Sequence, residues 1–270
     1  MWNKVQETVS YLKNIVKETP VYGIVLGSGL GDLVNEVKIT HTIPYEEIPN
    51  FPVSTVKGHQ GALVFGYIGE VFIMMLQGRF HYYEGYTMQE VTFPVRVMKQ
   101  LGVNRMVVSN ASGGVRADFV VGDVMLIKDH INQFPEHPLR GHNDERFGPR
   151  FVNMSEPYDK KMIAKVEEIA KTEGIAIKKG IYLGLQGPTF ETLAEYIMVK
   201  NLGADAVGMS TVPEVIVAKH MDMECFGISI ITDIGSEEEI GEISHQEVLE
   251  AANAATPKVS KLVSELIKQY

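Results

Sequence analysis

Short apolar segments that end in glycine or small polar residues alternate along the chain with segments of helical periodicity, and this alternation constrains the fold more than any other feature. Residues 21–31 form an apolar run that ends in glycines, and residues 224–233 form one that ends on an aspartate. Near the start, apolar residues recur at helical spacing, at Val5, Val9, Leu12 and Val16. We therefore expect one α/β domain over residues 1–270, with a central mixed sheet flanked by helices.

Local signals predict several further elements. Residues 62–77 have the pattern of a hairpin that turns at Gly69 and Glu70. Capping boxes predict helix starts at Thr87, Thr211 and Ser244, and the first of these helices is expected to run to Leu101 with a kink at Pro94. Residues 132–158 contain four prolines, so we expect a long ordered loop there, of a length that is usually functional.

Charge and composition exclude several classes of protein. The chain carries 25 Lys and Arg against 34 Asp and Glu, a formal net charge of −9. This balance argues against a nucleic-acid binder or a basic membrane-surface protein, but not against a small local anion site. No apolar run reaches the roughly 18 residues of a membrane helix, and the first residues do not resemble a signal peptide. We expect a cytoplasmic protein whose single cysteine, Cys225, is a buried core thiol.

Small or polar residues follow five predicted strands. They occupy positions 27–29, 77–79, 109–111, 209–210 and 232–233. Ligands of α/β sheets bind at the carboxyl ends of strands, so these segments are the candidate edges of a site. The glycine-rich segment 27–31 resembles a phosphate cradle in which Ser28 adds a hydroxyl. It matches neither the dinucleotide-binding nor the P-loop pattern, and a plain tight turn explains it equally well.

Arg79, His81, Tyr83 and Glu84 place four polar or ionisable side chains directly after an apolar strand. An arginine can hold a dianion through two donors and a nearby histidine can add a third, so the segment predicts an anion site. A solvated strand end with an Arg–Glu ion pair is the alternative. On local signals His59 is a turn histidine. The histidines form no metal motif, and the nucleophile pattern of serine hydrolases is absent.

Together the motifs resemble one family, the trimeric low-molecular-mass purine nucleoside phosphorylases, and most of all bacterial enzymes that act on inosine and guanosine. The matching segments follow the family's order: GSGLG (27–31), GHQG (58–61), QGRFHYYEGY (77–86), SNASGG (109–114), DHIN (129–132), PLRG (138–141), QGPTFET (186–192), GADAVGMSTVPEV (203–215) and ISHQEV (243–248). The resemblance implies a single domain with a partly barrel-like sheet. It also implies a pentosyltransferase that needs no metal or organic cofactor, uses inorganic phosphate as co-substrate and works as a homotrimer in purine salvage.

The same resemblance implies roles for individual residues. The phosphate site is expected at Ser28, Arg79, His81, the Ala111 backbone N–H and Ser210, with His59 beside it. The nucleoside site is expected at Tyr83 and Met209 for the ribose, His245 for the 5′-hydroxyl, and Tyr182, Glu191, Thr232 and Asp233 for the base. Phe151 resembles the aromatic residue that reaches into a neighbouring subunit's sugar site. The expected catalytic residues are His81, Glu191 and Asp233.

Asp233 departs from the family pattern, which usually has an asparagine there. An ionised aspartate only accepts hydrogen bonds and favours a 6-amino group, whereas a protonated one can donate to O6 or N7. Burial and the nearby Glu191 would both raise its pKa. Because Glu191 suits the N1–H of hypoxanthine and the N2 group of guanine, we expect inosine and guanosine as main substrates, with more tolerance of adenosine than asparagine enzymes show.

Three other functions compete with this interpretation. A methylthioadenosine phosphorylase shares the aspartate, but Glu191, Ser210 and His245 argue against it. A non-catalytic nucleoside-binding module would not need the phosphate residues Arg79, His81 and Ser210. A nicotinamide-dependent oxidoreductase would use the segment 27–31 as its dinucleotide loop, but the glycine spacing does not fit.

Overall fold

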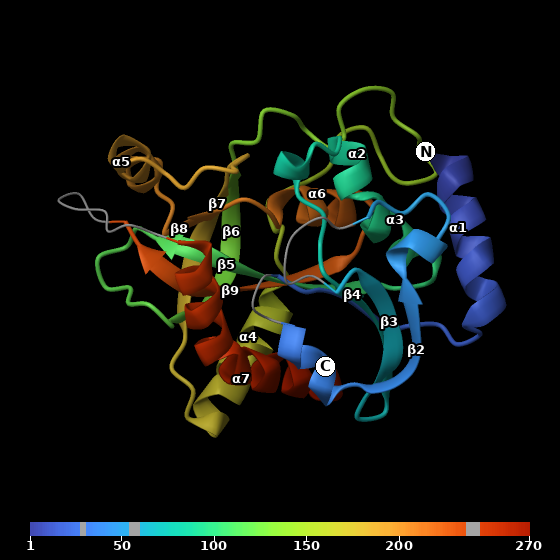
Figure 1. Ribbon diagram of the computed structural model, residues 1–270, viewed down its shortest axis with the longest axis horizontal. Helices are drawn as coiled ribbons and strands as arrows, with labels where there is room; N and C mark the ends of the chain where they lie inside the picture. The colour runs from blue at the N-terminus through green and yellow to red at the C-terminus, as the bar shows by residue number, and fades with distance from the viewer. Residues whose placement is uncertain (28–30, 54–59, 236–243) are drawn as a thin grey trace.

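The computed structural model describes residues 1–27, 31–53, 60–235 and 244–270. Within these residues nine strands form one mixed sheet in the order β2-β3-β4-β1-β5-β8-β7-β6-β9 (Figure 1). Because β5 also pairs with β9, the strands β5, β8, β7, β6 and β9 close into a ring. This confirms the predicted α/β fold with a mixed, partly barrel-like sheet. The strands are β1 (Tyr22–Val25), β2 (Lys38–Pro44), β3 (Ala62–Ile68), β4 (Val71–Gln77), β5 (Arg105–Gly114), β6 (Val124–Asn132), β7 (Lys178–Gly184), β8 (Ala206–Gly208) and β9 (Glu224–Ile234).

The central strands run in the same direction, so the polar segments that follow them lie at one edge of the sheet. Strand β1 is buried along its whole length and pairs in parallel with β4 and β5, and β5 pairs in parallel with β9. The carboxyl ends of these four strands therefore point the same way. Strand β8 runs antiparallel to β5, with Val207 opposite Gly113, so the chain that leaves β8 returns along β5. This return brings residues 209–210 to the same edge.

The helices form two groups on either side of the sheet in Figure 1. In one group, α3 (Phe93–Gln100) packs against α1 (Trp2–Ile15), α2 (Met88–Val91) and α6 (Val212–His220), whereas in the other α4 (Lys160–Glu173) packs against α7 (His245–Gln269). Helix α5 (Leu193–Asn201) lies on the side of the molecule opposite α1, at the left in Figure 1. Short 3-10 helices are η1 (Gly31–Glu36), η2 (Tyr45–Glu47) and η3 (Tyr82–Glu84).

Several local predictions are confirmed. Val5, Val9 and Leu12 are buried on α1, and β3 and β4 form the predicted hairpin, in which Ile68 pairs with Val71. No helix or strand interrupts residues 133–158, all of which the structure describes. Cys225 is a fully buried free thiol, and burial raises its pKa to about 12. A thiol in this state is an inert part of the core.

The single helix predicted from Thr87 to Leu101 is wrong. Thr87 does cap a helix, since its hydroxyl accepts a hydrogen bond from the Glu90 N–H, but that helix ends at Val91. Helix α3 begins at Phe93, with Pro94 in its first turn. A proline costs no hydrogen bond there because the first-turn N–H groups have no partner within the helix, so Pro94 starts a helix instead of kinking one.

The capping box predicted at Thr211 is also wrong, although the one at Ser244 is confirmed. Thr211 has a positive φ of 71° and its side chain caps nothing. Its hydroxyl instead accepts a hydrogen bond from Asn110, and Glu214 pairs with Arg79. Both side chains have buried partners that are distant in the sequence, Asn110 in β5 and Arg79 after β4, which local sequence does not reveal.

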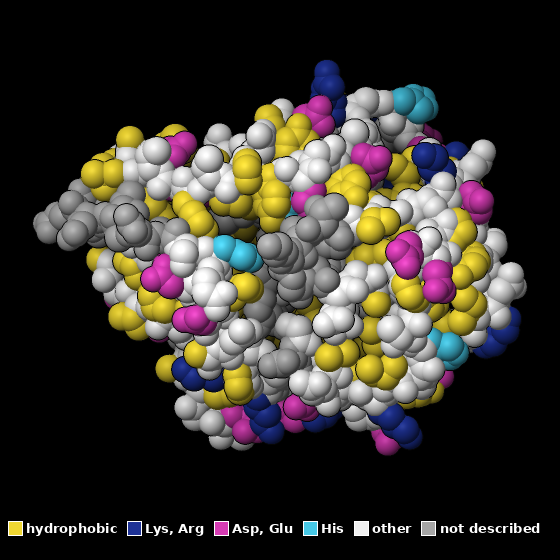
Figure 2. Space-filling view, in the orientation of Figure 1, with side chains coloured by type: hydrophobic (Ala, Val, Ile, Leu, Met, Phe, Trp, Pro, Cys, Tyr) yellow, Lys and Arg dark blue, Asp and Glu magenta, His cyan; other side chains and the backbone are white. Residues whose placement is uncertain are grey.

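The face shown in Figure 2 has no large basic patch among the described residues, as expected from the excess of acidic over basic residues in the sequence. On the face in Figure 2, the Lys and Arg side chains of the described residues are scattered among acidic and apolar ones. None of the described helices is long and apolar enough to cross a bilayer.

Candidate active site

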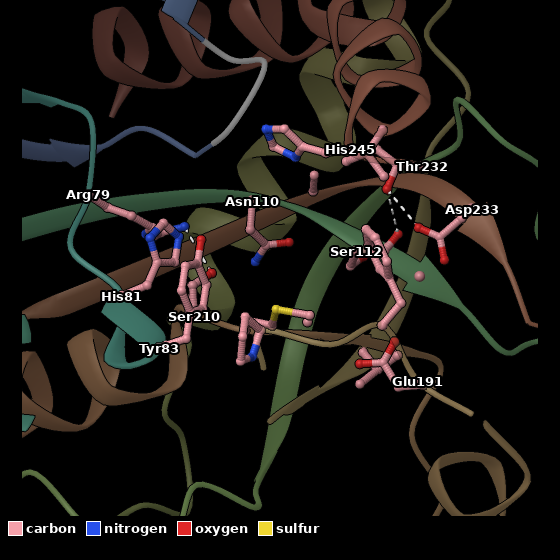
Figure 3. Close-up of a pocket in the computed structure, with 18 of the residues that line it drawn as sticks. Arg79, His81, Tyr83, Asn110, Ser112, Glu191, Ser210, Thr232, Asp233 and His245 are labelled. Atoms are coloured by element: carbon pink, nitrogen blue, oxygen red, sulfur yellow. Dashed lines mark hydrogen bonds between the residues drawn. The ribbon is translucent and has the colours of Figure 1, made fainter. Parts of the chain in front are cut away.

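A cavity of about 550 Å³ opens at the carboxyl ends of the central strands. Four of the five predicted strand ends contribute to its lining, through Arg79, Asn110 with Ala111, Met209 with Ser210, and Thr232 with Asp233. Figure 3 shows two groups of polar side chains in it. We call Arg79, His81 and Ser210 the arginine end, and Glu191, Thr232 and Asp233 the acid end.

Arg79 is the centre of the arginine end and is only 2% exposed. Its Nε donates to Glu214 Oε1 at 3.0 Å, and its Nη1 donates to the Ser109 carbonyl at 2.7 Å and to Ser210 Oγ at 3.1 Å. These bonds fix the plane of the guanidinium and turn it toward Ser210. Glu214 balances the buried charge, which would otherwise be costly.

His81 is held beside Arg79 by Glu84. One Glu84 carboxylate oxygen accepts from the His81 backbone N–H at 2.7 Å and lies 3.1 Å from Nδ1. The imidazole stacks on Tyr83, with ring centroids 4.7 Å apart. Burial lowers the pKa of His81, and the bond to Glu84 opposes this shift only in part. A neutral imidazole that donates from Nδ1 to Glu84 leaves Nε2 as an acceptor.

A chain of buried hydroxyl and amide groups supports the pocket between its two ends. Asn110 Nδ2 donates to Thr211 Oγ1 at 2.8 Å, and Asn110 Oδ1 accepts from Ser229 Oγ at 2.6 Å. Ser229 in turn lies 2.6 Å from Ser112 Oγ. Satisfied buried networks of this kind hold their members in one geometry.

A bulge in β9 lets two successive residues face the pocket. The pairing of β5 with β9 shifts between Ser112 and Gly113, and Thr232 has no partner in the register. In a regular strand, Thr232 and Asp233 would point to opposite faces. Here both line the cavity, and the Thr232 hydroxyl donates to Asp233 Oδ1 at 3.0 Å.

The acid end holds two carboxyl groups. Burial raises the pKa of Glu191 to about 7, and the nearby charge of Asp233 adds to this shift. Burial also raises the pKa of Asp233, against hydrogen bonds from Tyr196 and Thr232 that lower it. Tyr196 donates to Asp233 Oδ2 at 2.9 Å. Of the described residues that line the pocket, Arg79 is the only Lys or Arg, and it lies at the opposite end.

Three further predicted residues line the cavity. Tyr83 enters from η3 beside His81, and His245 is the first residue of α7 (Figure 3). Met209 follows β8. The Ser244 hydroxyl caps α7 and thereby fixes the helix start that carries His245. The structure therefore brings together ten predicted site residues: Arg79, His81, Tyr83, Ala111, Glu191, Met209, Ser210, Thr232, Asp233 and His245.

Four predicted residues are not among the lining residues. Ser28 and His59 lie outside the described residues, although Gly27 donates its N–H to Ser109 Oγ at 3.2 Å beside the arginine end. Tyr182 was expected near the base but is fully buried behind the wall, where its hydroxyl accepts from the Ser210 N–H at 3.3 Å. Phe151 is 89% exposed and outside this chain's pocket, so its expected contact with another subunit stays a prediction.

Sequence reasoning missed three supporting residues: Asn110, Tyr196 and Glu214. Asn110 lies in the strand end 109–111 that the sequence predicts as a site edge, but the family resemblance implies a role only for Ala111 there. Glu214 and Tyr196 carry no local signal, because their partners are 135 and 37 residues away. The described residues include no group of three His, Cys, Asp or Glu side chains that could hold a metal ion.

Comparisons with known proteins agree with this architecture. The model of the phosphorylase superfamily matches residues 21–268. Purine nucleoside phosphorylase 1 of Bacillus subtilis (strain 168) is 47% identical over 270 residues, which cover 100% of both chains. A schistosomal purine nucleoside phosphorylase solved in complex with hypoxanthine has a TM-score of 0.94 at 37% identity, over 99% of this chain and 97% of that one. The Schistosoma mansoni enzyme in complex with adenosine gives the same values.

Proposed function

Because the chain belongs to the phosphorylase superfamily, and within it to the purine nucleoside phosphorylases, we propose that it catalyses the reversible phosphorolysis of purine ribonucleosides and deoxyribonucleosides. The products are the free base and the pentose 1-phosphate. The observation that carries the proposal is one pocket with a buried Arg79 at one end and two carboxyl groups at the other. Such a pocket suits a substrate pair with an anion on one side and a hydrogen-bonding base on the other.

The arginine end is the proposed phosphate site. Arg79 offers a fixed cation, Ser210 a hydroxyl, and Ala111 a backbone N–H. In a neutral His81 whose Nδ1 donates to Glu84, Nε2 is an acceptor, which suits a phosphate O–H. Ser28 and His59 are proposed to complete this site on the family resemblance. Oriented donors of this kind bind an anion strongly in a water-poor pocket without a large net positive charge.

The middle of the pocket is the proposed sugar site, with Tyr83 and Met209 beside the ribose and His245 at the 5′-hydroxyl. Cleavage of a glycosidic bond passes through an oxocarbenium-like transition state. A phosphate dianion held below the sugar stabilises that cation and then attacks C1′. Phosphate is thus both nucleophile and electrostatic partner, and no protein nucleophile or cofactor enters the proposal.

The acid end is the proposed base site, with Glu191, Asp233 and Thr232 around the purine. As the base leaves, it gathers negative charge, which a donor near N7 or O6 stabilises. A carboxylate at Glu191 suits the N1–H of hypoxanthine and guanine. We propose inosine and guanosine as main substrates, with tolerance of adenosine because Asp233 can accept from a 6-amino group. Relatives solved with hypoxanthine and with adenosine support this range.

We further propose a cytoplasmic homotrimer active in purine salvage. The family resemblance supports the trimer, and Phe151, which has the largest exposed fraction of the large apolar side chains of the described residues, lies in the long segment that follows β6. In a trimer it would reach the sugar site of a neighbouring subunit.

The test is release of base from inosine and, separately, from adenosine, with and without phosphate. Phosphate-dependent release of hypoxanthine is the expected result. Release without phosphate would indicate a hydrolase. Activity on methylthioadenosine but on neither nucleoside would favour the methylthioadenosine phosphorylase, and binding without release would favour a non-catalytic module.

A further inference from the structure

Five buried polar side chains are joined by hydrogen bonds in a line, and the proposed function uses only the last of them. We call this line the buried network, and its members in order are Ser112, Ser229, Asn110, Thr211 and Ser210. They come from β5, from β9 and from the residues between β8 and α6. Each is at most 8% exposed, so these groups satisfy one another and not bulk water. Figure 3 labels Asn110, Ser112 and Ser210 in the pocket.

Asn110 gives the network its direction, because one end of an amide only accepts hydrogen bonds and the other end only donates them. The amide atom that faces Ser229 lies 2.6 Å from Oγ. N–H donors lie about 2.7–3.2 Å from an acceptor oxygen, and O–H donors about 2.5–3.0 Å. The short distance therefore identifies Oδ1 as the atom that faces Ser229, and Ser229 as the donor. Nδ2 then faces Thr211 and donates to its Oγ1 at 2.8 Å.

The single proton of each hydroxyl extends this direction to both ends of the network. Ser229 uses its proton on Asn110, so Ser112 must donate across the 2.6 Å contact between their hydroxyls. Thr211 is fully buried, and its proton goes to Ser210 Oγ at 3.2 Å, because a buried donor without an acceptor is costly. The hydrogen bonds therefore all run one way, from Ser112 toward Ser210.

Ser210 is then left with a proton to donate. Its Oγ accepts from Thr211 and also from Arg79 Nη1, which lies 3.1 Å away. These two bonds use both lone pairs of the hydroxyl oxygen. Because Ser210 lines the pocket beside Arg79 and His81, its proton is available to a ligand at the arginine end (Figure 3).

We propose that the buried network turns the Ser210 proton toward bound phosphate, which makes the four residues before Ser210 positioning residues for phosphate binding. The inference rests on the proposed function and deepens it, because the phosphate oxygen that faces Ser210 must be an acceptor without a proton. Successive hydrogen bonds polarise one another, so each member strengthens the last donor. Arg79 supplies the charge at this end of the pocket, and the network supplies the direction of the hydroxyl.

The first experiment removes the member next to Ser210. Thr211→Val keeps the branched shape but lacks the hydroxyl, so the Ser210 proton is no longer held toward the ligand. The Kd of inorganic phosphate, measured by titration calorimetry, should rise about tenfold, and KM for phosphate should rise with it. KM for inosine should change by less than about twofold, because the sugar and base contacts are retained. Thr211→Ser restores a hydroxyl and should bind phosphate within about twofold of the unaltered protein.

Thr92→Val is the matched control for Thr211→Val. Thr92 is also fully buried, but its hydroxyl donates to the Met88 carbonyl at 2.7 Å and it is not among the residues that line the pocket. This control should bind phosphate like the unaltered protein. An unchanged phosphate Kd in Thr211→Val would overturn the proposal. Equal rises in KM for phosphate and inosine would also overturn it, since they would indicate a general loss of packing.

The second experiment acts at the opposite end of the network. Ser112→Ala removes one oxygen atom and the first donor, so the phosphate Kd should rise about two- to threefold. It is mild enough to test the network even if Thr211→Val does not fold. In a Ser210→Ala background the last donor is absent, so adding Ser112→Ala should have no further effect. If the two changes were fully additive, Ser112 would act independently of Ser210 and the directed network would be refuted.

The same measurements separate this inference from the proposed function. If the unaltered protein binds phosphate but releases no base, the function fails, and the series of Kd values still decides whether the network is directed. If base is released but the phosphate Kd is insensitive to both Thr211→Val and Ser112→Ala, only the network is wrong. If phosphate does not bind, both fail.

Discussion

The two ends of the pocket differ in how their charges are balanced. At the arginine end, each ionisable group has a partner within hydrogen-bonding distance: Arg79 has Glu214, and His81 has Glu84. At the acid end, Asp233 accepts hydrogen bonds from the hydroxyls of Tyr196 and Thr232, and no lysine or arginine of the described residues lines that end beside Asp233 and Glu191. The arginine end is therefore a compensated end: its charges are paired, so its net charge and its geometry are fixed. An end with two acids has a charge that protons and ligands can change.

Arg79→Gln is the strongest test of the compensated end. The variant removes the cation and one arm of the fork that holds Ser210, so kcat/KM for phosphate should fall about 10³-fold. It also leaves Glu214 buried without its charge partner, so the free energy of unfolding should fall by about 3–5 kcal/mol. Phosphate titrations and chemical denaturation measure the two effects.

The double variant Arg79→Gln/Glu214→Gln sharpens this result. Removing the orphaned carboxylate should restore most of the stability, while the loss of activity remains. If activity returned with stability, Arg79 would serve the fold alone and the contrast between the ends would collapse.

Glu191→Gln tests the adjustable end through stability. The folded pKa of Glu191 is about 7 against an ordinary 4.5, so the folded protein holds this proton more tightly than the unfolded chain. That contribution is complete below about pH 4.5 and is lost as pH rises through 7. A glutamine does not titrate, so the variant should be more stable than the parent at about pH 8, by up to about 3 kcal/mol, and lose this advantage at about pH 4.

Denaturation midpoints at the two pH values measure this difference. Glu168→Gln, on the solvent face of α4, is the control and should show no gain at the higher pH. A pH-independent effect of Glu191→Gln would mean that Glu191 has the same pKa in the folded and the unfolded chain, so that the acid end does not hold a proton more tightly than water does.

Phe151→Ala has the smallest expected effect and asks whether the pocket is complete in one chain. Because Phe151 is 89% exposed, the free energy of unfolding of a single chain should change by less than about 0.5 kcal/mol. In the proposed trimer, KM for inosine should rise about three- to tenfold. Val120→Ala, which truncates another exposed apolar residue, should leave KM unchanged. A normal KM in Phe151→Ala would contradict the shared sugar site.

Sequence could predict the parts of the site that follow from strand direction. Polar segments after parallel strands meet at one edge, and this placed Arg79, Asn110, Ser210 and Asp233 around one cavity. Roles within the cavity came from the family resemblance instead, and Tyr182 shows its limit. Its position in the chain suggested a base contact, but its side chain lies behind Ser210.

Local patterns failed where a distant partner decided the outcome. Thr211 and Ser244 begin similar four-residue patterns, yet only Ser244 forms a capping box. Glu214 is drawn to Arg79 because a buried guanidinium needs an anion more than a helix needs a cap. The bulge at Thr232 likewise depends on the pairing of β9 with β5. Because of it, the side chains of Thr232 and Asp233 both point into the same cavity.

Strand β5 contributes to both ends, with Ala111 toward the arginine end and Gly113 beside Asp233. A strand advances about 3.3 Å per residue, so the backbone itself spaces these two positions by about 7 Å. The distance between these two positions is therefore set by the backbone of β5, and side-chain substitutions cannot increase it. Variants of this protein can exchange one purine for another, but a longer gap between anion and base would require a different strand.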